Sequence, residues 1–239
     1  MKNWELISFA TPDELARAVA DAWLEEVAAA NREGKAHCVA LSGGRISLKF
    51  FAAVLELVRA QGIALNHVHF FWADERCVPP TDAESNFSAA NEHFFKQLGI
   101  GAGQIHRIQG EMPPEKAAEL ATADIKRLVP IGNDNQPQLD LIFLGMGEDG
   151  HVASLFPGEA EVVQADPAVF RAIGNSPKPP PNRVTLGYAA IIAAKQVWVL
   201  ASGAGKHAAL NESLSPSGQT PLARVLQARQ NTKVFTDIV

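Results

Sequence analysis

Short apolar runs alternate along the chain with stretches whose apolar residues recur at helical spacing. The clearest run is Leu139–Leu144, written LDLIFL, and a glycine-rich segment follows it directly. From Ser47 to Arg59, apolar side chains lie three to four positions apart, which is the period of one helix face. Further strands are predicted at Ala36–Leu41, Val68–Trp72, Gln196–Ala201 and Val234–Val239, and further helices at Ser85–Leu98 (with Ser85 or Asn86 as its N-cap), Pro113–Leu128 and Ala204–Ser213.

Continuously apolar strands that alternate with helices predict an α/β fold with a doubly wound, mainly parallel sheet and helices on both faces. We expect one domain over residues 1–239, with the proline-rich piece Ser176–Pro181 as a rigid loop inside it. Ligands bind such sheets beyond the carboxyl ends of the strands. Four polar segments follow predicted strands and are therefore expected at that edge: Ser42–Arg45, Ala73–Arg76, Gly145–His151 and Ser202–Lys206.

Composition narrows the class of protein without indicating its chemistry. The 239 residues include 21 Lys and Arg against 26 Asp and Glu, a net charge of −5, which gives no basic footprint for nucleic acid. The longest wholly apolar run, Tyr188–Ala194, is too short to span a membrane. Two cysteines are too few for a disulfide framework. Acidic residues near the N-terminus lie where a signal peptide would have its apolar core, so a signal peptide is not expected. A cytoplasmic protein, monomeric or a small homo-oligomer, is expected.

The segment Leu41-Ser42-Gly43-Gly44 is the first candidate for ligand binding. Glycines let a backbone approach a ligand closely, and the following helix offers free N–H groups and a positive dipole end, which suit a phosphate. Arg45 adds positive charge. The alternative is a strand-to-helix turn that simply needs glycine. The spacing of this segment matches neither G-x-x-x-x-G-K-[ST] nor G-x-G-x-x-G, so a nucleotide P-loop is excluded and a dinucleotide site is disfavoured here.

Acid–base chemistry is indicated in the segment Gly145–His151. Histidine exchanges protons near neutral pH, and Asp149, two residues away, is placed to orient and polarise His151. The alternative is a loop histidine that caps the next helix. Asp74 and Arg76 follow another strand, where Arg76 suits a carboxylate or an oxyanion unless the cluster is only a solvated surface.

Other polar residues are weaker candidates. Arg183 and Lys206 are lone cations, which are usually surface charges. Lys206 near a helix N-terminus is mildly unfavourable unless an anion lies between its ammonium and the helix dipole. His67 and His69 share a strand face, but no third metal ligand is near, so a structural role is favoured. Cys77 is interpreted as a small buried residue. No serine lies in a G-x-S-x-G elbow, which disfavours a serine hydrolase.

Five segments, in order, resemble the 6-phosphogluconolactonase family. They are LSGG (41–44), FFWADERCVPPTDAESNF (70–87), LDLIFLGMGEDGHVASLFPG (139–158), SPKPPPNRVTL (176–186) and VWVLASGAGKHAAL (197–210). The resemblance implies hydrolysis of 6-phospho-D-glucono-1,5-lactone in the oxidative pentose phosphate pathway. Related glucosamine-6-phosphate deaminases share the Asp-Gly-His triplet, but they lack the ADERCVP and SPKPPP elements. Arg45 departs from the family, which commonly carries a small residue there.

On this basis we expect His151 to take a proton from water, with Asp149 orienting it and Arg76 or backbone amides stabilising the oxyanion. The phosphate is expected at Gly43, Gly44 and Arg45, completed by Arg183 and Lys206, with Ser42 and Asp74 as further substrate contacts. No metal or organic cofactor is expected, and the one partner is the sugar-phosphate lactone. The alternatives are a glucosamine-6-phosphate isomerase/deaminase and a non-catalytic sugar-phosphate sensor, although no helix-turn-helix candidate supports the latter. No feature indicates a module that binds a partner protein.

Overall fold

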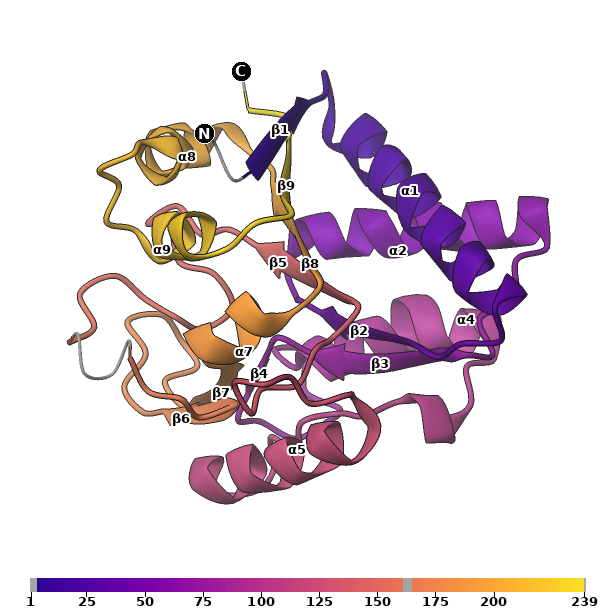
Figure 1. Ribbon diagram of the computed structural model, residues 1–239, viewed down its shortest axis with the longest axis horizontal. Coiled ribbons are helices and arrows are strands. Elements are labelled where there is room, and N and C mark those ends of the chain that lie inside the picture. Colours follow the sequence, from indigo (N-terminus) through magenta and orange to yellow (C-terminus); the bar gives the residue numbers. More distant parts are fainter. Residues whose placement is uncertain (1–3, 161–164, 239) are drawn as a thin grey trace.

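Six parallel strands form the central sheet of the computed structural model, which describes residues 4–160 and 165–238. Their order is β1-β9-β8-β5-β2-β3, and every neighbouring pair runs parallel (Figure 1). The strands are β1 (Trp4–Ser8), β2 (His37–Leu41), β3 (Val68–Trp72), β5 (Leu141–Gly145), β8 (Gln196–Ala201) and β9 (Thr232–Thr236). The predicted α/β fold is confirmed.

Helices cover both faces of this sheet. On one face, Trp23 of α1 (Pro12–Arg32) is fully buried and contacts the rings of Phe50 in α2 (Arg45–Gln61) and Phe143 in β5. On the other face, the side chain of Phe71 lines a groove together with residues of α5. The remaining helical segments are α3 (Asn86–Ala90), a π turn (Asn91–Phe95), α4 (Lys96–Leu98), a 3-10 turn (Ala102–Gln104), α5 (Pro114–Leu128), α7 (Tyr188–Ala193), a 3-10 turn (Ala204–Lys206), α8 (His207–Leu214) and α9 (Pro221–Ala228).

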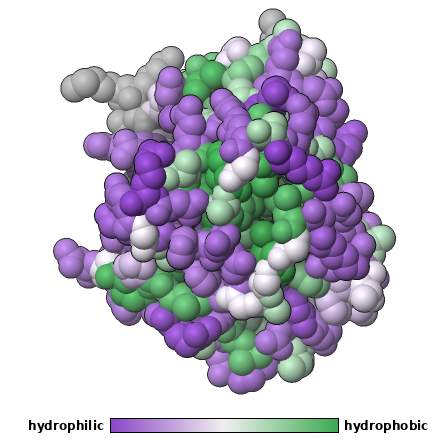
Figure 2. Space-filling view, turned by 90° about the vertical axis from the view of Figure 1, so that its right-hand side faces the viewer, coloured by the Kyte–Doolittle hydropathy of each residue, from purple (hydrophilic) through white to green (hydrophobic). Residues whose placement is uncertain are grey.

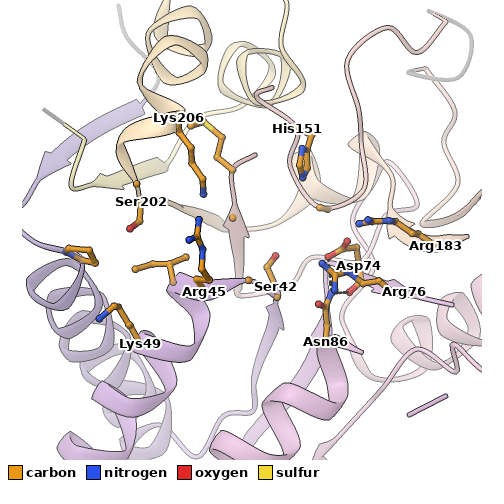
Figure 3. Close-up of a pocket in the computed structure, with 18 residues that line it drawn as sticks. Ser42, Arg45, Lys49, Asp74, Arg76, Asn86, His151, Arg183, Ser202 and Lys206 are labelled. Atoms are coloured by element: carbon orange, nitrogen blue, oxygen red, sulfur yellow. Dashed lines mark hydrogen bonds between the residues drawn. The ribbon is translucent and has the colours of Figure 1, made fainter. Parts of the chain in front are cut away.

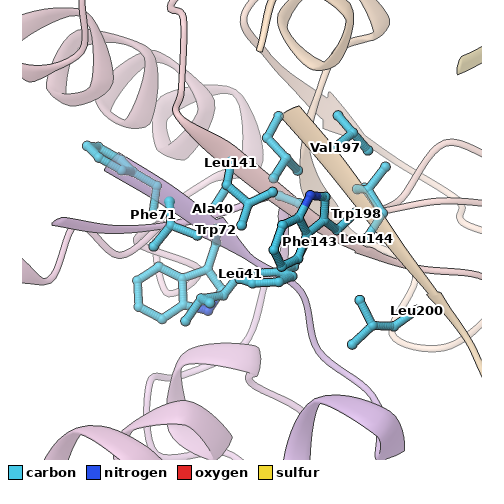
Figure 4. Packing of buried hydrophobic residues seen from close by; sticks show 14 of the residues in the cluster. Ala40, Leu41, Phe71, Trp72, Leu141, Phe143, Leu144, Val197, Trp198 and Leu200 are labelled. Atoms are coloured by element: carbon cyan, nitrogen blue, oxygen red, sulfur yellow. The ribbon is translucent and has the colours of Figure 1, made fainter. Parts of the chain in front are cut away.

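The core is continuous across the central strands. Figure 4 shows apolar side chains of β3, β2, β5 and β8 packed side by side, with Trp72 and Trp198 among them. Because both faces of these strands are buried, they read as unbroken apolar runs, and this is why the sequence identified them. The face shown in Figure 2 is mostly polar around an apolar area in its middle. Among the described residues, no helix has the length and apolarity to cross a membrane.

A second, antiparallel sheet was not predicted. It has the order β4-β7-β6, with β4 (Asp74–Arg76), β7 (Arg183–Leu186) and β6 (Phe170–Ile173). Its pairing sets Arg76 opposite Arg183. Three charged residues carry no strand pattern, so β4 depends on the partner strand that tertiary structure brings to it. The sheet matters for function because it fixes two charged segments at the carboxyl edge of the main sheet.

Several element boundaries differ from the prediction. The helix expected from Ser47 begins at Arg45, and the helix expected over Ser85–Leu98 is interrupted by the π turn, although Ser85 is its N-cap and accepts from the Ser88 amide. The last strand ends at Thr236, and Val239 lies outside the described residues. The elements β1, α1, α7, α9 and the small antiparallel sheet were not predicted from the sequence.

Candidate active site

A cavity of about 360 Å³ opens at the carboxyl ends of the central strands, and all four predicted segments reach it. Residues after β2, β3, β5 and β8 line it, as the topology requires of parallel strands. Nine of the ten predicted site residues are in the lining: Ser42, Gly43, Gly44, Arg45, Asp74, Arg76, His151, Arg183 and Lys206. The tenth, Asp149, reaches the cavity through a hydrogen bond to His151.

The glycine pair forms the entry to α2. Gly44 is the N-cap with φ of 100°, a conformation that favours glycine, and no side chain caps the helix. A Cβ on Gly43 would lie 1.9 Å from Asn86 Oδ1, so only glycine fits beside that side chain. The Ser47 amide bonds the Gly44 carbonyl at 3.2 Å, but no hydrogen bond within the described chain engages the amides of Arg45 and Ile46, so these remain available at the cavity, where they favour an anion. Ser42 instead donates its hydroxyl proton to the Phe143 carbonyl at 2.8 Å, so its side chain serves to join β2 to β5.

Positive charge gathers at this end of the cavity. Figure 3 shows Arg45 and Lys206 pointing toward one another, with Lys49 on the same side. Lys49 pairs with Asp13 at 2.6 Å, whereas neither Arg45 nor Lys206 has a carboxylate ion-pair partner among the described residues. Burial first, and then the nearby Arg45 guanidinium, lower the pKa of Lys206. Two cations that repel each other in a half-buried site are stabilised by an anion between them.

The Asp149–His151 pair lies at a different part of the same cavity. Asp149 Oδ1 accepts from His151 Nδ1 at 2.5 Å, which leaves Nε2 without a hydrogen bond from the described part of the chain. Gly147 makes room for this pair, because a Cβ there would lie 2.0 Å from Nδ1. The His151 side chain is 18% exposed, so it is largely sheltered but reachable. The geometry provides an oriented imidazole with one nitrogen free to exchange a proton.

Two opposing effects set the proton affinity of this pair. Burial lowers the pKa of His151, and it outweighs the hydrogen bond and charge of Asp149, which act to raise it. Burial alone would raise the pKa of Asp149, but its hydrogen bond to His151 and the nearby charges bring it below its usual value. The pair is therefore a neutral imidazole and a carboxylate near neutral pH, which is the state of a general base.

Arg183 lies apart from the cation pair with which it was predicted to bind phosphate. In Figure 3, His151 stands between Lys206 on one side and Arg183 on the other. Arg183 is buried, with 4% of the residue exposed. Its Nη1 donates to Ser154 Oγ at 3.3 Å. Its Nε and Nη2 donate to the carbonyls of Lys178, Pro179 and Pro180. Most of its donors are thus committed to the proline loop.

Asp74 and Arg76 occupy the Arg183 end. The Asp74 carboxylate accepts from Ser154 Oγ at 2.6 Å and from Asn86 Nδ2 at 3.3 Å, and neither of these two residues was predicted as part of the site. Arg76 donates to the Glu84 carbonyl at 2.7 Å, while its Nε is buried without a partner in the described chain. Arg76 lines the cavity, its Nη1 also lies 3.6 Å from Glu84 Oε2, and no hydrogen bond from the described chain engages its Nη2, which is the donor left for an oxyanion.

Glu75 holds the backbone next to Asp74 and Arg76 through hydrogen bonds to its buried carboxylate. Its carboxylate is 2% exposed and accepts from the amides of Arg76, Asn86 and Phe87 at 2.7–2.8 Å. Ser85 Oγ donates to it as well, at 3.0 Å. Burial raises the pKa of Glu75 and these hydrogen bonds counter that effect. The Glu75 carboxylate, at the start of α3, thereby fixes the backbone positions of Arg76 and Asn86 and so orients their side chains at the cavity.

Outside the cavity, His69 Nδ1 lies 3.0 Å from His106 Nε2, and His106 in turn contacts Asp124 at 2.9 Å. These side chains lie on the α5 side of the sheet, away from the residues that line the cavity. Within residues 4–160 and 165–238, no group of three His, Cys, Asp or Glu side chains is arranged to hold a metal ion.

Comparison with known proteins decides the family. The family described as glucosamine-6-phosphate isomerases/6-phosphogluconolactonase matches residues 10–235. The chain belongs to this family. A probable chloroplastic 6-phosphogluconolactonase of Oryza sativa is 34% identical over 242 residues, 97% of this chain and 73% of the relative. The 6-phosphogluconolactonase of Mycobacterium tuberculosis is 35% identical over 88% of this chain and 85% of its own.

A solved family structure shows the same architecture. The 6-phosphogluconolactonase of Trypanosoma brucei superposes with a TM-score of 0.84 at 27% identity, covering 99% of this chain and 97% of that one. The resemblance predicted from five short segments is thus confirmed over nearly the whole chain. Because relatives include proteins named as chloroplastic, the cytoplasmic location stays a prediction.

Sequence reasoning assigned no role at the site to four residues: Glu75, Asn86, Ser154 and Lys178. All four lie inside segments that carried the family resemblance, and that was the available signal. Lys178 Nζ lies 3.3 Å from Asp149 Oδ1 and 3.4 Å from His151 Nδ1. Their roles consist of contacts between distant segments, which spacing along the chain does not reveal.

Proposed function

We propose that the protein hydrolyses 6-phospho-D-glucono-1,5-lactone to 6-phosphogluconate, with water activated by His151 and the phosphate held at the Arg45–Lys206 end of the cavity. The activity is that of a 6-phosphogluconolactonase, a lactone hydrolase of the pentose phosphate pathway. One observation carries the mechanism: an oriented imidazole and a pair of cations without carboxylate partners in the described chain face the same cavity. A sugar with a phosphate at one end and a reactive carbonyl at the other matches that arrangement.

Phosphate binding supplies energy at a distance from the reacting carbon. The dianion meets the free N–H groups at the start of α2, the Arg45 guanidinium and the Lys206 ammonium. Held there, the substrate has its ring directed toward the loop that carries His151. Binding energy from the unreactive end is thereby used to position the carbonyl.

The chemical step follows from the state of the Asp149–His151 pair. Neutral His151 accepts a proton at Nε2 from water while the water oxygen adds to C1 of the lactone. Asp149 keeps the ring oriented and stabilises the imidazolium that forms. Arg76 is the side chain that we assign to the tetrahedral oxyanion, because it lines the cavity and its Nη2 makes no hydrogen bond within the described chain.

Collapse of the intermediate completes the reaction. The bond from C1 to the ring oxygen breaks, and the imidazolium returns its proton to that oxygen, which becomes the C5 hydroxyl. The new carboxylic acid ionises in water, so one proton is released for each lactone opened. General acid–base assistance of this kind contributes roughly 10²–10⁴ in rate.

The runner-up, deamination of glucosamine 6-phosphate, has less support. The residues after His151 read Val152-Ala153-Ser154-Leu155-Phe156-Pro157-Gly158, without a carboxylate. The next acidic side chain, Glu159, is paired with Arg171 at 3.1 Å. Release of ammonia from glucosamine 6-phosphate at a rate comparable with lactone opening would favour the deaminase.

The test is proton release from freshly prepared lactone, with spontaneous opening subtracted. We expect the phosphorylated lactone to be opened with a kcat/KM far above that of unphosphorylated gluconolactone. Arg45→Met should remove much of this preference, because it removes one phosphate ligand. Equal kcat/KM for the two lactones would contradict the phosphate site.

A further inference from the structure

Lys178 is placed beside the nitrogen of His151 that is turned away from the reaction. Its Nζ donates to Asp149 Oδ1 at 3.3 Å and approaches His151 Nδ1 to 3.4 Å. The Nδ1 proton is already engaged by Asp149, so the approach of Lys178 to Nδ1 is a contact of charge rather than a second hydrogen bond. His151 lines the cavity, whereas Lys178 and Asp149 are not among the lining residues. The side-chain contacts of Lys178 are thus with the Asp149–His151 pair.

The position of Lys178 is built into the fold. Buried Arg183 donates to the carbonyls of residues 178, 179 and 180, so one guanidinium gathers three successive carbonyls of the proline loop. Ser176 Oγ donates to the Lys178 carbonyl at 2.9 Å. Pairing of β7 with β4 holds Arg183 itself beside the cavity. A long, half-exposed side chain is thus attached to a backbone that many hydrogen bonds fix.

An Asp–His pair on its own has a disadvantage as a base. A carboxylate at 2.5 Å favours the imidazolium, and an imidazolium cannot accept a proton from water. The charged groups that face His151 are Asp149 on its own loop, Asp74 at the start of β4 and Lys178 on the proline loop. Both carboxylates favour the protonated ring. Burial is the main effect that opposes them, and Lys178 is the cation that acts in the same direction.

We propose that Lys178 is a positioning residue of the hydrolysis, whose ammonium, fixed beside Nδ1 by the loop that Arg183 holds, adds to burial in keeping His151 neutral and ready to accept a proton from water. This inference rests on the proposed role of His151 as the base. The same repulsion acts after the proton has moved. An imidazolium next to an ammonium returns its proton to the ring oxygen more readily, which assists the second half of the reaction.

The test replaces Lys178 by Met, by Gln and by Arg, with Lys116→Met as the matched control. Lys116 lies on α5 and pairs with Glu119 at the surface, so its loss removes the same charge far from the site. The first measurement is the NMR titration of the His151 ring, which needs no catalysis. The second is the pH profile of kcat/KM for the phosphorylated lactone.

In Lys178→Met and Lys178→Gln, the His151 midpoint should rise by about one pKa unit, because a half-exposed charge at this distance is screened nearly as in water. The acid limb of kcat/KM should move with it, so activity well below the midpoint falls up to about tenfold, while KM stays unchanged. Lys178→Arg should restore the wild-type midpoint, and Lys116→Met should not move it.

A His151 midpoint that is the same in wild type and in both neutral variants would overturn the proposal. So would an equal shift in Lys116→Met, or a rise in KM without movement of the acid limb, since the latter identifies Lys178 as a substrate ligand. The titration separates this inference from the proposed function: a wild-type protein that opens no lactone refutes the function, while the His151 midpoints still report whether Lys178 controls the ring.

Discussion

Replacing Lys206 by Met is expected to weaken substrate binding and, at the same time, to stabilise the free protein. Lys206 and Arg45 face each other across the cavity, and burial together with Arg45 lowers the pKa of Lys206. A lysine whose folded pKa lies below its unfolded value costs folding free energy while it is charged. Met keeps the bulk of the side chain and removes the charge.

The two effects have different sizes and opposite signs. A charge-assisted hydrogen bond to the phosphate contributes roughly 1.5–3 kcal/mol, so kcat/KM should fall by about 10- to 150-fold. For a chain of this length, each ~1 kcal/mol of added stability raises Tm by about 2–4 °C. Lys206→Met should therefore melt above the wild type when no ligand is present, and 6-phosphogluconate should raise its Tm less than it raises that of the wild type.

The assay combines proton-release kinetics on the phosphorylated lactone with thermal melting with and without 6-phosphogluconate. Lys116→Met, which removes an exposed lysine on α5, is the control and should change neither measurement. A folded Lys206→Met protein with wild-type KM would refute the reasoning. A Tm below that of the wild type would refute it as well, because the ammonium would then be stabilising the empty site.

Three further predictions follow from the site. Asp149→Asn should lower kcat at least tenfold with KM nearly unchanged, since the ring loses its orienting carboxylate; steady-state kinetics check this. Gly147→Ala should lower kcat similarly without unfolding the protein, because the new Cβ displaces the His151 ring; kinetics and circular dichroism check this. Burial lowers the pKa of His37, His69 and His151, so the folded protein binds fewer protons than the unfolded chain, and unfolding free energy should fall as pH drops below about 6.5, measured by urea midpoints.

The parallel sheet was predictable because its central strands are buried on both faces. Val68–Trp72 and Gln196–Ala201 have the predicted bounds, and the run at Leu139–Leu144 overlaps β5 (Leu141–Gly145). Parallel topology then brings the segments after these strands together without knowledge of any side-chain contact. This is why most of the predicted site residues line one cavity.

Other elements escaped prediction for identifiable reasons. The helix α1 does carry the expected signals, with Thr11 as N-cap and buried Leu15, Val19 and Trp23 at helical spacing. Its sequence pattern was therefore sufficient to predict a helix, although none was predicted there. The strand β4 carries no such signal, because three charged residues become a strand only when β7 lies beside them. Local pattern was sufficient in the first case and absent in the second.

Roles within the site depended most on tertiary contacts. Arg183 was predicted to hold phosphate because it is a cation near a predicted loop, but its donors are directed to three backbone carbonyls and Ser154. Lys178 stood in the same motif without being selected. Which of two nearby cations faces the cavity and which faces the catalytic pair depends on loop geometry, and the order of residues in the motif does not encode it.

The most direct test of the account is the activity of His151→Asn on freshly prepared 6-phosphogluconolactone, with spontaneous opening subtracted. Asn is smaller than His and retains polar atoms at the site, so the variant should melt close to the wild type. The account predicts that enzymatic proton release falls by roughly 10²–10⁴-fold while 6-phosphogluconate still raises Tm. A folded His151→Asn protein that opens the lactone at the wild-type rate would contradict the central claim that this imidazole activates water.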